Sequence, residues 1–272
     1  MTQARKRFGQ NFLEEVWVRK VIKAIAPEPN QYFIEVGPGH GALTAPLTGA
    51  AARVWAFEID RDLVGGLRAT APPNLTVIEG DFLSVTAEWL RELLPADALA
   101  RPIRVAGNLP YNVASPILFK LVELYTSGIP LVDATVMLQR EVADRLTAGP
   151  GTREYGVLSV LIQHSAVVER IVNLPPGAFR PAPKVHSALV RLRFHPPSPP
   201  AQDPAGMTAL VQAVFTRRRK TLANALLAYQ PAPRFPTPGE ALALAGLDGT
   251  RRPETLSIGD FVRLSDSYRP PA

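Results

Sequence analysis

The chain has 272 residues, of which 46% are hydrophobic and 20% charged, and it contains no cysteine. This length accommodates one α/β domain with a smaller appendage, and the lack of cysteine excludes disulfides and thiolate metal sites. The four histidines show no metal-ligand spacing, no apolar run is long enough to cross a bilayer, and the basic start of the chain lacks a secretory core. We therefore expect a cytoplasmic protein without a metal.

Short apolar, β-branched runs alternate with helical patterns in the first half of the chain. The predicted strands are 32–37, 53–60, 75–82, 103–110 and 133–139, and the predicted helices are 41–51, 62–69, 84–94 and 114–126. This alternation is typical of a parallel, doubly wound sheet. Beyond it we predict a helix at 157–165 and two more strands, 167–174 and 186–194, around a proline-rich loop. The fold class is therefore α/β, with a Rossmann-like sheet.

A proline-rich segment interrupts the chain at 195–204, where five of ten residues are Pro. Neither a helix nor a central strand tolerates that density of proline. We therefore predict one domain over 1–195, a linker over 196–204 and a small helical domain over 205–272. Helical patterns at 206–229, 238–246 and 254–268 make up this second domain.

A glycine-rich loop follows the first predicted strand, in IEVGPGHGALT (34–44). Gly37, Gly39 and Gly41 allow backbone N–H groups before a helix to approach a polar ligand. Glu58 ends the second strand, 21 residues after Gly37, where a carboxylate can accept both hydroxyls of a ribose. Asp81 closes the third strand. The loop alone does not distinguish a nicotinamide dinucleotide from S-adenosylmethionine.

The segment GNLPYN (107–112) ends the fourth predicted strand, the edge at which open α/β sheets bind ligands. The Asn108 side-chain oxygen and the Leu109 carbonyl are two acceptors that suit the two N–H groups of an adenine amine. Such a pair draws the nitrogen toward tetrahedral geometry and frees its lone pair. Pro110 restrains the Leu109 carbonyl, and Tyr111 offers a flat face to a base. Phe179, on the proline-rich loop, is a second candidate for stacking on a base turned out of its helix.

These motifs together resemble the ribosomal RNA adenine dimethyltransferase family. The matching segments are FGQNFL (8–13), EVGPGHG (35–41), NLPY (108–111), FRPAPKV (179–185), QREVADRLTAGPGTREYGVLSVLIQ (139–163) and FTRRRKTLANAL (215–226). They are spread over nearly the whole chain, so chance is implausible.

The resemblance implies transfer of methyl groups from S-adenosylmethionine to N6 of two adjacent adenosines in the terminal stem-loop of small-subunit ribosomal RNA. The substrate would be this RNA or a precursor of the small subunit, and we expect a monomer that binds no membrane. The residues implied at the cofactor are Asn11, Leu13, Gly37, Glu58, Asp81 and Asn108, and the glycine loop adds Gly39.

Basic residues cluster in two regions, and nine basic but only five acidic residues lie from Ala205 onward. In 215–226 a helical pattern places Phe215, Leu222, Ala225 and Leu226 toward a core, with the basic side chains outward and Arg219 partly inward. The residues predicted to bind RNA phosphates are Arg5, Lys6, Arg7, Lys184, Arg217, Arg218 and Lys220.

Three alternatives remain at this point. The related enzymes of erythromycin resistance methylate large-subunit RNA with the same chemistry, although the helical pattern at 215–226 favours the small-subunit branch. A nucleic-acid-binding factor on this fold would not need the intact Asn108–Tyr111 quartet and Glu58. A dehydrogenase would have no use for NLPY at the fourth strand.

Overall fold

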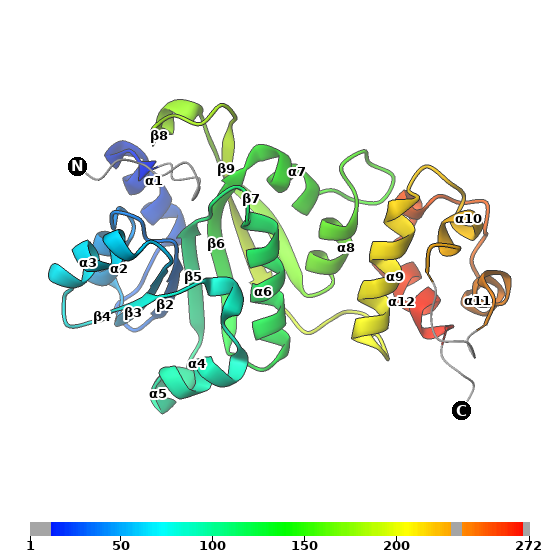
Figure 1. Cartoon of the computed structure of the whole chain (residues 1–272), viewed down its shortest axis with the longest axis horizontal. Coiled ribbons are helices and arrows are strands. Elements are labelled where there is room, and N and C mark those ends of the chain that lie inside the picture. Colours follow the sequence, from blue (N-terminus) through cyan, green and yellow to red (C-terminus); the bar gives the residue numbers. More distant parts are fainter. Residues whose placement is uncertain (1–11, 230–235, 269–272) are drawn as a thin grey trace. The chain divides into compact units, whose positions relative to one another are not determined.

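The computed structural model describes residues 12–229 and 236–268, which fall into two units, each with its own core (Figure 1). The first unit contains the described residues up to Ala143 together with Val167–Phe194. The second contains Asp144–Ala166 and the described residues from His195 onward. None of the described helices is long and apolar enough to span a membrane.

A seven-stranded sheet forms the centre of the first unit, in the order β4-β3-β2-β5-β6-β9-β7. Its strands β2 to β6 are parallel, and β9 runs antiparallel to β6. The bounds are β2 (Tyr32–Val36), β3 (Arg53–Glu58), β4 (Leu75–Glu79), β5 (Ile103–Asn108), β6 (Leu131–Gln139), β7 (Ala166–Leu174) and β9 (Ser187–Phe194). The predicted parallel, doubly wound core is confirmed, and each strand lies within two or three residues of its predicted bounds.

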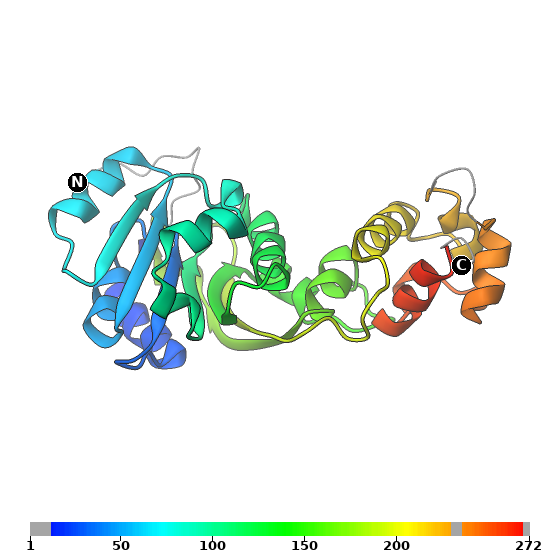
Figure 2. The ribbon, with the colours of Figure 1, turned by 90° about the horizontal axis from the view of Figure 1, so that it is seen from below.

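The order in which the chain adds strands to the sheet reverses after β4. It runs from β2 outward through β3 to β4, then returns to β5 on the other side of β2 and continues to β6. Crossovers in opposite directions place helices on both faces of the sheet, as Figures 1 and 2 show. The crevice between the carboxyl ends of β2 and β5 is the topological switch point, where such folds bind ligands.

Helices and short 3-10 turns connect the strands. They are α1 (Glu15–Ile25), α2 (Thr44–Ala50), α3 (Arg61–Ala69), η2 (Phe82–Ser84), α4 (Ala87–Leu93), α5 (Ala96–Leu99), α6 (Ala114–Thr126), α7 (Arg140–Leu146) and η3 (Pro176–Ala178). The sequence predictions had no element at α1, although Trp17, Val18, Val21, Ile22 and Ile25 recur at helical spacing along it. Only Val21 and Ile25 of this helix are buried.

The central strands are nearly continuous hydrophobic runs because helices cover both faces of the sheet. Phe33, Val54 and Val105 are all at most 1% exposed. Gly107 is required by this packing: a Cβ there would lie 2.4 Å from the Val36 carbonyl oxygen. The glycine therefore allows β2 and β5 to meet closely beside the switch point.

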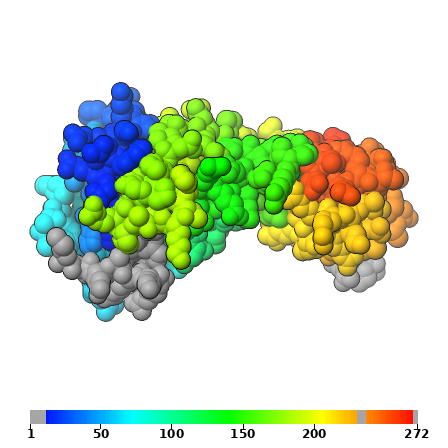
Figure 3. Space-filling view, turned by 90° about the horizontal axis from the view of Figure 1, so that it is seen from above, coloured from blue at the N-terminus to red at the C-terminus, as the bar shows by residue number. Residues whose placement is uncertain are grey.

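The second unit is a helical bundle of α8 (Val157–Gln163), α9 (Pro204–Thr216), α10 (Leu222–Leu226), α11 (Pro238–Ala245), η4 (Pro253–Thr255) and α12 (Ile258–Asp266). In the space-filling view α12 lies beside α9 (Figure 3). Val160, Val211, Leu226 and Phe261 belong to one buried cluster. This bundle has a hydrophobic core of its own.

The boundary between the units differs from the predicted one. Residues 144–166, predicted to belong to the first domain, are part of the second unit. Fully buried Tyr155 packs in its core and donates from its hydroxyl to the Leu256 carbonyl at 2.9 Å. The predicted linker also belongs to this unit, since the Ser198 N–H donates to the His164 carbonyl at 3.0 Å. The local apolar pattern of 157–165 indicated a helix but carried no information about which core it joins.

The predicted helix 206–229 is also two helices, because α9 ends at Thr216 and α10 begins at Leu222. The four residues RRRK lie in the turn between them. Leu222, Ala225 and Leu226 are fully buried as predicted. The run of four cations therefore lies on a turn rather than along a helix face.

Candidate active site

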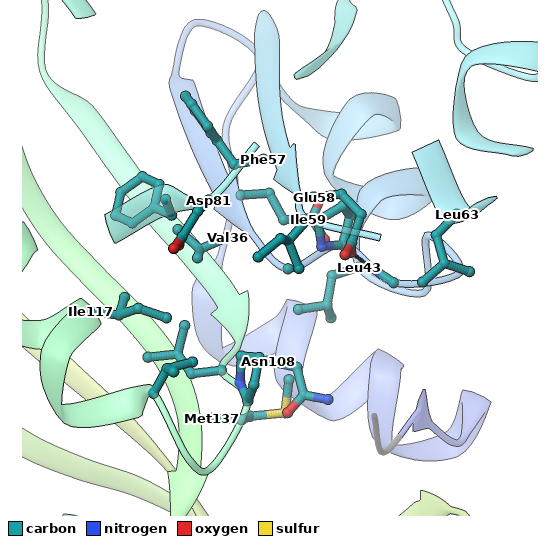
Figure 4. Close-up of a pocket in the computed structure, with 18 of the residues that line it drawn as sticks. Val36, Leu43, Phe57, Glu58, Ile59, Leu63, Asp81, Asn108, Ile117 and Met137 are labelled. Carbon is teal, nitrogen blue, oxygen red and sulfur yellow. Dashed lines mark hydrogen bonds between the residues drawn. The ribbon is translucent and has the colours of Figure 1, made fainter. Parts of the chain in front are cut away.

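A cavity of about 310 Å³ opens at the switch point of the first unit. Its walls come from the ends of β2, β3, β4 and β5, from η2 and from the short strand β1 (Phe12–Leu13). Glu58, Asp81 and Asn108 lie around it, as Figure 4 shows. The structure thus brings together carboxylate and amide side chains that are separated by up to 50 residues in sequence.

The glycine loop after β2 follows a left-handed path. Gly37, Gly39 and Gly41 have φ values of +69°, +61° and +84°, which L side chains rarely adopt. The Gly37 N–H donates to the Phe57 carbonyl at 2.9 Å, and the Gly39 N–H donates to Glu58 Oε2 at 3.0 Å. These two N–H groups are therefore engaged within the protein. The contact of this loop with a cofactor stays a prediction.

Glu58 is held at the end of β3 and is only 6% exposed. Its two oxygens accept hydrogen bonds from the backbone N–H groups of Gly39 and Asp60, the latter at 2.9 Å. Burial raises the pKa of Glu58, and these backbone donors oppose the rise. Each oxygen retains a lone pair, so the carboxylate can still accept hydrogen bonds from a ligand.

Asp81 lies at the start of η2, on the rim of the cavity. Its Oδ1 accepts the Leu83 N–H at 2.9 Å, which orients the carboxylate. Beside it, the rings of Phe57 and Phe82 meet edge to face with centroids 5.3 Å apart. Ile59 is 49% exposed and also lines the cavity. A flat, weakly polar group would find apolar walls here with a carboxylate at its edge.

Glu35 is a cavity residue that the sequence predictions did not single out. It lies within β2 and is 1% exposed, and its Oε2 has no hydrogen-bond partner among the described residues. Burial, with the charge of Glu58 adding to it, raises the pKa of Glu35 to about 8. The signal in the sequence is an acidic residue inside an otherwise apolar strand. Glu35 therefore stays protonated at neutral pH.

The NLPY quartet begins at the end of β5. Its Leu109 is 1% exposed and donates its N–H to the Met137 carbonyl at 3.1 Å, which continues the pairing with β6. The Val113 N–H donates to the Pro110 carbonyl at 3.1 Å, which starts the turn into α6. Asn108, Leu109, Pro110 and Tyr111 all line the cavity. The backbone that carries the two predicted acceptors is thus fixed by hydrogen bonds at Leu109 and at Pro110.

Phe179 lies in the protein core rather than at the cavity. It is 3% exposed, forms the short strand β8 (Phe179–Arg180) and pairs with Leu13 of β1. The ring belongs to the buried cluster that includes Leu174 and Leu189. This geometry does not support the predicted stacking on a base. Sequence patterns do not reveal the pairing of Phe179 with the chain-distant strand β1, whose Leu13 belongs to the same cluster.

The other predicted residues are distributed as follows. Leu13 lines the cavity, whereas Asn11, Arg5, Lys6 and Arg7 lie outside the described residues.

In the second unit, Arg217, Arg219 and Lys220 are exposed, so Arg219 does not point inward as predicted. Arg218 is the partly buried member of the run, and its Nε lies 2.5 Å from Glu254 Oε2. Lys184 is exposed in the loop between β8 and β9 of the first unit.

The described part of the chain contains no cluster of three or more His, Asp or Glu side chains that could hold a metal ion. Metal independence stays a prediction.

The sheet order, the glycine loop and the strand-end carboxylates define a Rossmann-like methyltransferase. Among solved structures, the 23S rRNA methyltransferase ErmE is 26% identical, with a TM-score of 0.66, over 95% of this chain and 99% of that one. A dimethyladenosine transferase from Plasmodium falciparum has a TM-score of 0.71 at 24% identity and covers 93% of this chain and 95% of its own. The likeness to the Plasmodium protein shows the fold.

Sequence comparisons narrow the class further. Residues 1–268 match the family described as ribosomal RNA adenine dimethylase. The ribosomal RNA small subunit methyltransferase A of Acinetobacter baylyi is 43% identical over 98% of this chain and 93% of its own length. The protein of the same name from Laribacter hongkongensis is 41% identical over 97% and 95%. The chain belongs to the ribosomal RNA adenine dimethylase family and is a methyltransferase.

Proposed function

We propose that this enzyme uses S-adenosylmethionine to dimethylate N6 of two adjacent adenosines in the terminal stem-loop of small-subunit ribosomal RNA. The observation that carries this proposal is the convergence of Glu58, Asp81 and Asn108 on one cavity at the switch point. The first two suit a nucleoside cofactor, and the third begins a quartet suited to an adenine amine. The substrate is free ribosomal RNA or an assembling small subunit in the cytoplasm, and the enzyme acts as a monomer.

The cavity fits the nucleoside part of the cofactor. Glu58 would accept hydrogen bonds from the two ribose hydroxyls, and Asp81 would accept one from the exocyclic amine of the cofactor's adenine. Ile59 and Phe82 would pack against the adenine ring. Gly37 and Gly39 leave room beside the sugar because neither carries a Cβ. Leu13, and Asn11 outside the described residues, complete the proposed site. When bound, the cofactor supplies an electrophilic methyl group.

The target amine is activated by position. The Asn108 side-chain oxygen and the Leu109 carbonyl accept the two N–H groups of the adenine amine, which concentrates its lone pair on the side facing the methyl group. Pro110 limits the movement of the Leu109 carbonyl, and Tyr111 supports the base by stacking. The methylated nitrogen is cationic and loses a proton readily, so the residues of the quartet need not include a strong base.

The second unit is proposed to select the RNA. Arg217, Arg219 and Lys220 are exposed on the turn between α9 and α10, where they can reach phosphates. Arg218 holds this turn through Glu254 and through the Thr152 carbonyl, to which it donates at 3.2 Å. Lys184, with Arg5, Lys6 and Arg7 outside the described residues, would add contacts from the first unit.

A methylation assay tests the proposal. Purified protein is incubated with labelled S-adenosylmethionine and either small-subunit or large-subunit ribosomal RNA that lacks these methyl groups, and the modified positions are mapped. We expect label at two adjacent adenosines near the 3′ end of the small-subunit RNA. The similarity to ErmE makes large-subunit RNA the informative competitor. Label confined to large-subunit RNA, or no label at all, contradicts the proposal.

A further inference from the structure

The hydroxyl of Tyr111 is tied to a residue that the proposed chemistry does not use. Tyr111 Oη and Ser187 Oγ lie 2.6 Å apart, although the two residues are 76 positions apart in the chain. Ser187 is fully buried and is the first residue of β9, directly opposite Gln139 of β6. Tyr111 follows the end of β5. The hydrogen bond therefore joins the turn after β5 to the start of β9, and β6 lies between these two strands in the sheet.

We propose that Ser187 is a positioning residue for methyl transfer, because its hydroxyl holds the Tyr111 ring in place as the platform for the target adenine. This inference rests on the proposed function. The tyrosine is held at its backbone by the turn after β5 and at its oxygen by β9, so rotation of the side chain would break the hydrogen bond. A ring fixed before the base arrives loses no freedom on binding, and the base is held in line with the methyl group.

The position of Ser187 also connects the platform to the loop of residues 181–186. That loop leads directly into Ser187, and the His186 carbonyl accepts the Arg140 N–H at 2.9 Å. The loop carries exposed Lys184, one of the proposed RNA contacts. The end of this loop is thus fixed both to the end of β6 and, through Ser187, to the base platform. An RNA that binds the loop is held in register with the ring.

The ionisation of Tyr111 offers an independent measure of the contact. Burial raises the pKa of the Tyr111 phenol, and the hydrogen bond from Ser187 opposes that rise. Removing the serine hydroxyl should therefore raise the pKa of this tyrosine further. The change is visible as a shift of one tyrosine ionisation to higher pH in an ultraviolet titration of the variant compared with the wild type, and a serine that served only to fill space would not cause it.

The test compares Ser187→Ala, Tyr111→Phe and the double variant for kcat and KM on small-subunit ribosomal RNA, and for cofactor affinity. We expect each single variant to lose about 10-fold in kcat, the scale of one hydrogen bond, with unchanged affinity for S-adenosylmethionine. The double variant should be no worse than either single one, because both remove the same contact. The matched control is Thr135→Val, which removes another buried hydroxyl of the same sheet, the one that accepts from Arg191 Nε at 3.1 Å. It should lower the melting temperature and leave kcat unchanged.

Three results would overturn the inference. One is a Ser187→Ala variant whose kcat stays within twofold of wild type. Another is additive losses in the double variant, and a third is an equal loss in Thr135→Val, which would make the effect one of general stability. If Ser187→Ala does not fold, the kcat of Tyr111→Phe tests the inference instead. Full activity of that variant rejects a role for the hydrogen bond. A wild type inactive on small-subunit RNA contradicts the proposed function instead, so the two failures are distinguishable.

Discussion

The amino-terminal and carboxyl-terminal ends of the parallel strands form the amino edge and the carboxyl edge of the sheet. Buried polar groups are paired differently at these two edges. At the amino edge, the guanidinium of Arg104 is 8% exposed, and all five of its N–H groups donate hydrogen bonds. At the carboxyl edge, Glu35 is only 1% exposed, yet its Oε2 has no partner among the described residues and its pKa is raised to about 8. Satisfied polar groups stabilise a fold, whereas buried groups with shifted pKa values cluster at functional sites.

The partners of Arg104 show what the amino edge stabilises. Asp133 accepts two of its N–H groups, both at 2.9 Å, and Gln31 accepts a third at 2.9 Å. The remaining two reach the carbonyls of Ile25 and Ala26, where α1 ends. Arg104 therefore joins the end of α1 to Asp133 of β6, and it does not line the cavity.

The largest expected effect is on stability, from Arg104→Met. Removing Arg104 leaves Asp133 only the longer pair with Arg191, whose Nε lies 3.9 Å from Oδ2, and leaves the Ile25 and Ala26 carbonyls without this donor, so we expect a cost of about 3–5 kcal/mol of unfolding free energy. Denaturant titration measures the loss, and kcat of the folded protein should stay near wild type. The control is Arg61→Met, which removes the exposed pair with Glu79 and should scarcely change stability. A large loss of kcat without a loss of stability would break the division between the two edges.

The next effect is on catalysis, from Asn108→Ala. Loss of one preorganised acceptor should lower kcat by about 100-fold or more while the circular dichroism spectrum stays native. Some weakening of cofactor binding is compatible with the role, since Asn108 also lines the cofactor cavity. Asn173→Ala, at an exposed amide on β7, serves as the control. Turnover within a few-fold of wild type would remove Asn108 from the proposed chemistry.

Glu35→Gln should change how stability depends on pH. Glutamate in the unfolded chain ionises near pH 4.5, whereas Glu35 in the folded protein keeps its proton until about pH 8. Between these values the unfolded state releases a proton that the folded state retains, so wild-type stability falls as pH rises, by up to about 1.4 kcal/mol per pH unit from this group. Glutamine carries no such dependence. The stability of the variant relative to wild type should rise from pH 5 to 8 and then level off; a flat difference would place the Glu35 pKa in its ordinary range.

A smaller effect is expected at the basic turn of the second unit. Replacing Arg217 and Lys220 with Ala should flatten the dependence of RNA affinity on salt by up to about two log-log units, one for each phosphate contact. Arg218→Ala should flatten it less, because Arg218 is paired with Glu254. RNA titrations at several salt concentrations measure the slopes, and cofactor binding should not change. Slopes equal to that of the wild type in all variants would indicate that Lys184 and Arg5–Arg7, rather than this turn, contact the RNA.

The smallest expected effect is that of chelation. A reaction driven by positioned acceptors needs no metal, so EDTA should leave activity on a short, stably folded RNA unchanged. The control is the same RNA checked for folding without Mg²⁺ by its melting profile. Loss of activity with intact RNA would require a metal in the mechanism.

The sequence alone determined the arrangement of the cavity. Gly37, Glu58, Asp81 and Asn108 each lie within two residues of the end of a predicted parallel strand, and the carboxyl ends of parallel strands share one edge of a sheet. Strand patterns depend on local alternation of apolar and polar residues, so they could be recognised before the fold was known. The family resemblance added Leu13, which the structure places in the cavity wall.

Only the tertiary structure decided the contacts between distant segments. The burial of Phe179 in the core of the first unit, the ion pair of Arg218 with Glu254 and the membership of residues 144–166 in the helical unit all depend on which surfaces meet. The same holds for the bond between Tyr111 and Ser187 and for the raised pKa of Glu35. A residue pattern reports which side chains are apolar, but burial and pairing are properties of neighbours that the chain brings together only when it folds.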